Sequence, residues 1–135
     1  MKESTIRRKS FDFASRIVKA YKFLVSEHRE YVLSKQLLRS GTSIGANVEE
    51  AVAASSSADF IHRLSIAVRE ARETSYWLRL LYDNDFLSEA SFASIHGHNQ
   101  ELIKILTSII LTTKHNQQDK QKQQEKQDKQ NEKNS

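Results

Sequence analysis

The side chains that could carry catalysis or hold a metal in this chain are five histidines and 17 acids, with no cysteine among them. Di-iron helical bundles need two Glu-x-x-His pairs, and the nearest match is the single Asp59-x-x-His62. Glu70-x-x-Glu73 is only the first half of the metal-binding pattern of bundle-shaped nucleotide pyrophosphatases. Helical RNases place an Arg shortly before a His, and none of the five histidines has an Arg five to seven positions before it.

His96 and His98 form the one close histidine pair. Residues two apart on a helix point about 200° apart, so these two rings cannot converge on one ion. The three glycines, Gly41, Gly45 and Gly97, cannot be assembled into a phosphate-binding loop. We therefore expect no enzyme activity, no metal, no cofactor and no small-molecule substrate.

Basic residues are the remaining candidates, because residues 1–40 hold ten Lys and Arg against four acids. Five of them form the basic face of the first helix, where they indicate either an ordinary solvated face or a surface for RNA or DNA: Arg8, Lys9, Arg16, Lys19 and Lys22. Phe23 lies among these cations and could stack on a base or cover a contact between subunits. The candidate nucleic-acid-binding residues are Arg8, Lys9, Arg16, Lys19, Lys22 and Arg39.

The elements that position these residues are predicted to be helices. The chain has no Pro and only three Gly, which excludes sandwiches, barrels and propellers because their turns depend on those residues. Apolar side chains recur at helical spacing over residues 10–27, 31–54, 59–82 and 88–115, with Ser10, Ser56 and Ser88 as predicted N-caps. The fold class is therefore all-α: an antiparallel up-down-up-down four-helix bundle in one domain, residues 1–115.

The last twenty residues, 116–135, contain seven Gln, five Lys and three Asn, without one apolar side chain. Such a segment buries nothing that offsets its ordering entropy, so we expect a disordered tail or at most a fraying helical extension. No apolar run reaches the ~20 residues needed to span a bilayer. We expect a soluble cytoplasmic protein without a membrane partner.

Some apolar residues point away from the predicted core and favour self-association, since a monomer seldom exposes a large apolar patch. The predicted oligomer interface consists of Phe23, Trp77, Leu80 and Leu81. The alternative is a protein-interaction module that docks a partner through the Trp77 surface. Gly41 and Gly45, four residues apart in the second helix, indicate either a close helix crossing or a break.

Three runs carry a resemblance to a known family: RSGTSIGANVEEA from Arg39, DFIHRLSIA from Asp59 and EARETSYWLRLL from Glu70. Together they resemble the bacterial "four helix bundle protein" family, also called the 23S rRNA intervening-sequence protein family. The resemblance covers about residues 10–112. The family signature falls on Arg39, Ser43, Asn47, Glu50, Glu70, Glu73, Trp77 and Arg79.

This resemblance implies a small up-down-up-down bundle that assembles in characterised relatives as a ring-like homopentamer. One divergent branch binds nucleic acid and a reverse transcriptase, so a docking partner here would be a protein of that kind or a ribosome-associated protein. The polar signature residues Asn47 and Glu50 are expected either to hydrogen-bond a neighbouring helix and fix its register, or to line a site between helices. The function indicated by sequence is a non-enzymatic, homo-oligomeric, RNA-binding scaffold.

Overall fold

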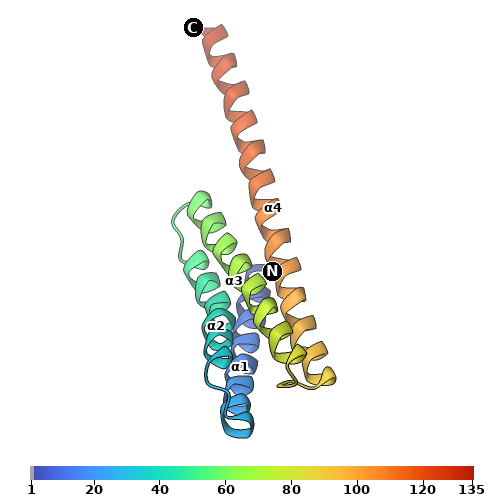
Figure 1. Ribbon diagram of the computed structural model, residues 1–135. Coiled ribbons are helices and arrows are strands. Elements are labelled where there is room, and N and C mark those ends of the chain that lie inside the picture. The colour runs from blue at the N-terminus through green and yellow to red at the C-terminus, as the bar shows by residue number, and fades with distance from the viewer. Residues whose placement is uncertain (1) are drawn as a thin grey trace.

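The computed structural model of the chain describes residues 2–135, and the side chains from Thr5 onward. Over this range the chain forms four helices joined by short connections and no strand, which confirms the predicted all-α bundle (Figure 1). Successive helices pack side by side, and the contact of α1 with α4 is the least extensive of the four helix pairs. The helices are α1 (Lys2–His28), α2 (Leu33–Val52), α3 (Ser57–Asp83) and α4 (Glu89–Asn134).

The core of the bundle is built from the apolar stripe of each helix. The fully buried large side chains come from all four elements: Ile6, Phe13, Ile17, Leu24, Leu37, Ile44, Val48, Leu64, Leu78, Leu81, Leu102 and Leu106. Burial of each such side chain contributes roughly 1.5–3 kcal/mol relative to exposure, which makes this stripe the main source of stability.

Helix α1 begins earlier than its apolar spacing predicted, and the N-cap assigned to Ser10 is wrong. Ser10 lies inside the helix, where it is buried and its Oγ donates to the carbonyl oxygen of Arg7, at 3.2 Å. Ile6 is 1% exposed and extends the apolar stripe by two turns toward the N-terminus. A serine hydroxyl can bond a preceding carbonyl as well as cap a helix, so the residue type alone did not distinguish the two positions.

The other two predicted caps are confirmed. Ser56 Oγ accepts a hydrogen bond from the backbone N–H of Asp59, and Ser88 Oγ accepts one from that of Ser91, both at 3.1 Å. Both caps satisfy a helix N–H that has no partner within its own helix.

Helix α2 is capped by a residue that the sequence pattern did not indicate. The carboxylate of Glu30 accepts from the backbone N–H groups of Val32, Leu33 and Ser34, at 3.0, 2.8 and 2.6 Å. Partial burial acts to raise the pKa of Glu30, but these N–H donors outweigh it and hold the pKa below its usual value. The cap is therefore strongest when Glu30 is ionised.

The two glycines of α2 mark a close helix crossing, not a break. Helix α2 is continuous through both of them. A Cβ placed on Gly41 would lie 2.7 Å from Cγ1 of Ile17, and one on Gly45 would lie 3.3 Å from the carbonyl oxygen of Ser10. Their absent side chains therefore let the backbone of α2 approach α1 closely.

Helix α4 is 46 residues long and runs well beyond the other three helices (Figure 1). The expectation of a disordered tail over residues 116–135 is corrected, because residues 116–134 continue α4 as the helical extension that was its alternative. Gln and Lys favour helix, and pairs four residues apart bond along this segment, including Gln124 to Asp128 at 2.9 Å. Its side chains are almost all exposed.

Candidate nucleic-acid interface

The six basic residues predicted to bind nucleic acid fall into two groups, according to whether another side chain already engages them. Arg39, Lys9 and Arg16 are engaged by residues of α3 or α4. Arg8, Lys19 and Lys22 are exposed and make no hydrogen bond or ion pair within the described part of the chain. The structure therefore separates cations that pair helices from cations that remain available to a ligand.

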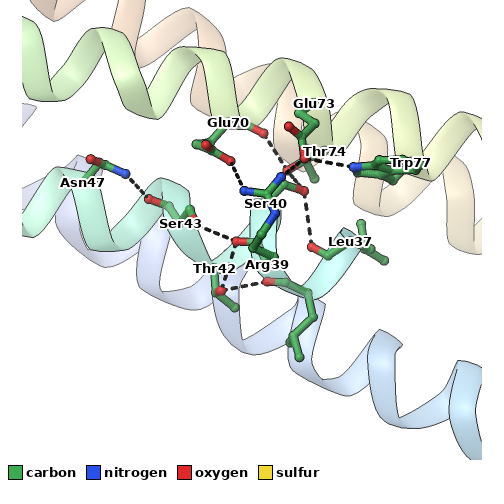
Figure 2. Close-up of polar contacts among 11 residues, drawn as sticks. Leu37, Arg39, Ser40, Thr42, Ser43, Asn47, Glu70, Glu73, Thr74 and Trp77 are labelled. Atoms are coloured by element: carbon green, nitrogen blue, oxygen red, sulfur yellow. Dashed lines mark hydrogen bonds and ion pairs between the residues drawn. The ribbon is translucent and has the colours of Figure 1, made fainter. Parts of the chain in front are cut away.

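Arg39 belongs to a polar cluster between α2 and α3 (Figure 2). Its guanidinium reaches from α2 to two acids of α3, with Nη1 3.2 Å from Oε2 of Glu70 and Nη2 in contact with Oε2 of Glu73. The same Glu73 oxygen accepts the indole N–H of Trp77, at 3.0 Å. We call Arg39, Glu70, Glu73 and Trp77 the signature cluster. Its charges are satisfied internally, so Arg39 serves helix pairing and is not a free cation.

Beneath the signature cluster lies a buried hydroxyl pair. Thr74 Oγ1 is 2.9 Å from Oγ of Ser40 and 2.8 Å from the carbonyl oxygen of Glu70, and both hydroxyl residues are fully buried. Buried polar groups that find each other across two helices fix the register of those helices. The signature cluster and this hydroxyl pair thus mark the α2–α3 contact.

Lys9 and Arg16 connect α1 to α4. Lys9 Nζ lies 2.5 Å from Oε1 of Glu101, and this contact holds the pKa of the Glu101 carboxyl below its usual value. Arg16 Nη2 donates to Oγ of Ser94 at 2.8 Å, and its Nη1 lies 3.5 Å from Nδ1 of His98. These long polar side chains connect α1 to α4, the helix pair with the least extensive contact.

The three unpaired cations share one line along α1, which we call the basic stripe: Arg8, Lys19 and Lys22. At about 100° per residue the three lie within about 60° of arc, and 14 residues of helix separate its ends by about 21 Å. Asp12 is exposed about 40° from Arg8, at the flank of the stripe. A linear cationic surface of this kind can contact successive phosphates of one strand.

The remaining polar signature residues do not bridge helices. Asn47 Nδ2 donates to the carbonyl oxygen of Ser43 in its own helix at 2.8 Å, and Ser43 Oγ donates to that of Arg39 at 2.5 Å (Figure 2). Glu50 and Arg79 are exposed. The expectation that Asn47 and Glu50 bond a neighbouring helix is therefore wrong, because the side chain of Asn47 turns back along α2 and that of Glu50 faces solvent.

One predicted oligomer-interface residue lies in the core. Leu81 is 0% exposed and belongs to the bundle interior, so it does not form part of an outer surface. Trp77 and Leu80 are half-buried, and Tyr76 beside them is 48% exposed. The angular estimate failed for Leu81 because the end of α3 is covered from a second side by the α3–α4 connection, where Leu87 is buried.

The histidines of α4 point to different neighbours, as their spacing predicted. His96 Nε2 lies 2.9 Å from Oγ of Ser75 on α3, whereas His98 meets Phe13 of α1 edge to face, with ring centroids 5.1 Å apart. Burial lowers the pKa of both rings, and Arg79 near His96 and Arg16 near His98 add to this effect. Within residues 2–135 there is no group of three or more histidines and acids that could hold a metal ion.

Sequence reasoning missed a cavity of about 740 Å³ between α1 and the α3–α4 connection. Its lining comes from two stretches far apart in sequence, residues 16–28 and residues 82–95, and no spacing rule relates them. Its charged and aromatic lining includes Arg16, Lys19, Phe23, Tyr82, Asp85 and Glu89. Only the placement of Phe23 among cations hinted at this cavity.

The fold and these contacts define a four-helix bundle in which Arg39, Glu70 and Glu73 join α2 to α3 and in which α1 carries exposed cations without an ion pair in the described chain. The chain belongs to the family described as 23S rRNA-intervening sequence protein, which matches residues 2–108. A solved structure, described as a protein with unknown function from the S23 ribosomal protein family of Bacteroides thetaiotaomicron VPI-5482, shares 53% sequence identity with it. The match has a TM-score of 0.81 and covers 82% of this chain and 98% of that one.

A search among curated proteins found no match. Within the described residues, no helix combines the length and the apolar character needed to cross a membrane.

Proposed function

We propose that this chain is a non-enzymatic, homo-oligomeric, cytoplasmic scaffold that binds RNA through the basic stripe of α1. The observation that supports this proposal is that Arg8, Lys19 and Lys22 lie on one line, exposed, with no acid paired to them in the described chain. Elsewhere in the bundle, Arg7, Lys9 and Arg39 each reach an acid on another helix.

The strength of such a surface depends on how many times it is repeated. Three cations on one subunit release few counterions from RNA, so a single copy binds weakly. An assembly presents the stripe once per subunit. The same phosphate contacts are then repeated, and together they raise the affinity for RNA. RNA binding and self-association therefore support each other in this proposal.

Exposed apolar side chains support the self-association. Phe11, Val32 and Leu111 are 72%, 71% and 61% exposed, and Tyr76 extends the surface that includes Trp77 and Leu80. Burying such side chains against further copies of the chain removes apolar area from water. The resemblance to pentameric relatives leads us to propose five subunits.

The test is a charge-reversal pair with a matched control. Arg8→Glu with Lys22→Glu places two acids on the basic stripe, while Arg69→Glu with Arg72→Glu makes the same charge change on exposed positions of α3. Binding to a 23S rRNA fragment is measured by fluorescence anisotropy. We expect the first pair to weaken binding at least tenfold and the control pair to change it less than threefold.

Light scattering on the same preparations separates binding from assembly. The wild type and both variants should keep one mass, near five times the 15.6 kDa of a single chain. Equal affinity of the two variant pairs would contradict the basic stripe as the binding surface. A wild-type mass of one chain would contradict the oligomer.

A further inference from the structure

The cavity beside α1 has an aromatic wall. Phe23 of α1 is 44% exposed and meets His28 edge to face at 5.3 Å, and His28 in turn meets Phe86 at 5.6 Å. Tyr82 at the end of α3 is 37% exposed and stacks on Phe92 at 4.6 Å. Two partly exposed rings, each held from behind by other rings, are thus presented to a space of about 740 Å³.

The charges around this cavity differ by side. Arg16 and Lys19 of α1 line one side, and Asp85 of the α3–α4 connection and Glu89, the first residue of α4, line the other. Arg16 is oriented by Ser94, whereas the side chains of Lys19, Asp85 and Glu89 make no hydrogen bond or ion pair within the described chain. Charged groups of both signs are therefore left without partners around one apolar wall.

Asp85 owes its position to the way α3 ends. Its φ is +66°, and the backbone N–H groups of Asp85 and Phe86 bond back to the carbonyls of Tyr82 and Leu81 at 3.1 and 2.9 Å. This is the left-handed helix end that glycine usually occupies and that Asn and Asp tolerate best among the other residues. The turn places Asp85 at the lining of the cavity.

The chemistry of this cavity points to a ligand with a flat aromatic group, an anion at one end and a hydrogen-bond donor at the other. A nucleotide has that arrangement: the base can stack on the rings, the phosphate can pair with cations, and an exocyclic amino group can donate to a carboxylate. Purely apolar occupants, such as a side chain from another copy of the chain, would leave the carboxylates and Lys19 unpaired.

We propose that this cavity binds one unstacked nucleotide whose base carries an exocyclic amino group, with the phosphate toward Arg16 and Lys19 and the base edge toward Asp85 and Glu89. The inference rests on the proposed RNA binding, since the nucleotide is one residue of a bound single strand. Single-stranded RNA is typically read in this way, through stacked bases and hydrogen bonds to their edges. The basic stripe then holds neighbouring phosphates, and the cavity selects a base.

The experiment uses mononucleotide pairs in which one member carries an exocyclic amino group and the other does not, measured by isothermal titration calorimetry on the full-length protein. CMP is compared with UMP, and GMP with IMP. We expect CMP and GMP to bind at least fivefold more tightly than their partners. We expect Phe23→Ala with Tyr82→Ala to weaken CMP binding by roughly five- to 150-fold, the range for loss of one stacked base.

Two conservative substitutions test the role of the carboxylates. Asp85→Asn keeps a residue that tolerates positive φ, and Glu89→Gln keeps the length of the side chain. These variants should bind CMP and UMP with equal affinity while melting within a few degrees of the wild type. Equal binding of CMP and UMP by the wild type would overturn the inference, as would a change of oligomer mass in Phe23→Ala, which would make the cavity a contact between copies.

Failure of this inference is distinguishable from failure of the proposed function, because Arg8 and Lys22 do not line the cavity. If Phe23→Ala leaves RNA affinity unchanged while Arg8→Glu with Lys22→Glu abolishes it, the cavity is not a nucleotide site and the basic stripe stands. If the wild type binds CMP selectively but no RNA, the cavity stands as a nucleotide site and the proposed function fails.

Discussion

Helix α1 has two neighbours, and it contacts them in different ways. Against α2 it packs closely, because Gly41 and Gly45 allow the backbones to approach Ile17 and Ser10. Against α4 it packs less extensively, through long polar side chains such as Lys9 to Glu101, and the cavity opens beside that contact. One flank of the helix therefore holds the fold together, while the other leaves charge and space for a ligand.

The same contrast separates the cations. Some cations face acids across a helix contact, as Arg39 of α2 faces Glu70 and Glu73 of α3. Lys19 and Lys22, which are exposed on α1, make no ion pair within the described part of the chain. Exposed ion pairs contribute only about 0–1 kcal/mol each, so the distribution of charge here says more about binding than about stability.

The largest expected effect comes from placing a side chain at the close α1–α2 crossing. Gly41→Leu places a side chain where even a Cβ lies 2.7 Å from Ile17, so the helices must separate, and we expect a loss of about 3 kcal/mol in the free energy of unfolding. Urea denaturation followed by circular dichroism measures it. Gly97→Leu is the matched control, because a Cβ there meets nothing within 4 Å and leaving glycine favours helix by roughly 1 kcal/mol. Equal stability of the two variants would contradict the close crossing.

A smaller effect is expected at the α1–α4 contact, through His98. Burial lowers the pKa of this ring, and Arg16 and Lys9 add to the shift while Glu101 and Asp12 oppose it. The folded state therefore takes up the proton less readily than the unfolded chain, so stability should fall as the pH drops through the unfolded value near 6.5. Unfolding free energies at pH 7.5 and pH 5.5 measure the effect.

The replacement His98→Gln should reduce this loss of stability, because it removes one of the two histidines with lowered pKa. His62→Gln, at an exposed position on α3, is the control and should leave the loss unchanged. The lowered pKa values of Glu30 and Glu101 affect stability in a separate, more acidic pH range. The stability that these two carboxylates contribute is lost only when the pH falls below about 4.5. An identical pH response in wild type and His98→Gln would contradict the burial argument.

Local patterns predicted the fold well because a helical bundle is made of local structure. Apolar spacing located the four helices, and Ser56 and Ser88 capped two of them as expected. Predictions failed where one residue type suits two positions in a helix. Ser10 could cap α1 or lie within it, and it lies within it. The early start of α1 goes with the burial of Ile6, a single apolar residue among polar and charged neighbours that lies before the predicted helix of residues 10–27.

The site could be predicted only in part, because pairing is decided by residues distant in sequence. The basic face of the first helix was visible, but nothing in it indicated that Arg16 meets Ser94, 78 positions later, or that Lys9 meets Glu101, 92 positions later. The cavity depends in addition on the left-handed turn at Asp85. Such a turn is set by the whole α3–α4 connection and has no spacing signature.

The most direct test of the central claim is the salt dependence of RNA binding. Each phosphate contact that a Lys or Arg makes adds about one unit to the slope of log affinity against log salt concentration. For each assembled subunit that contacts the RNA, Arg8→Gln with Lys22→Gln should lower this slope by about two units, while Arg69→Gln with Arg72→Gln should leave it unchanged. A wild-type slope near zero, or an equal reduction in both variant pairs, would contradict RNA binding by the basic stripe.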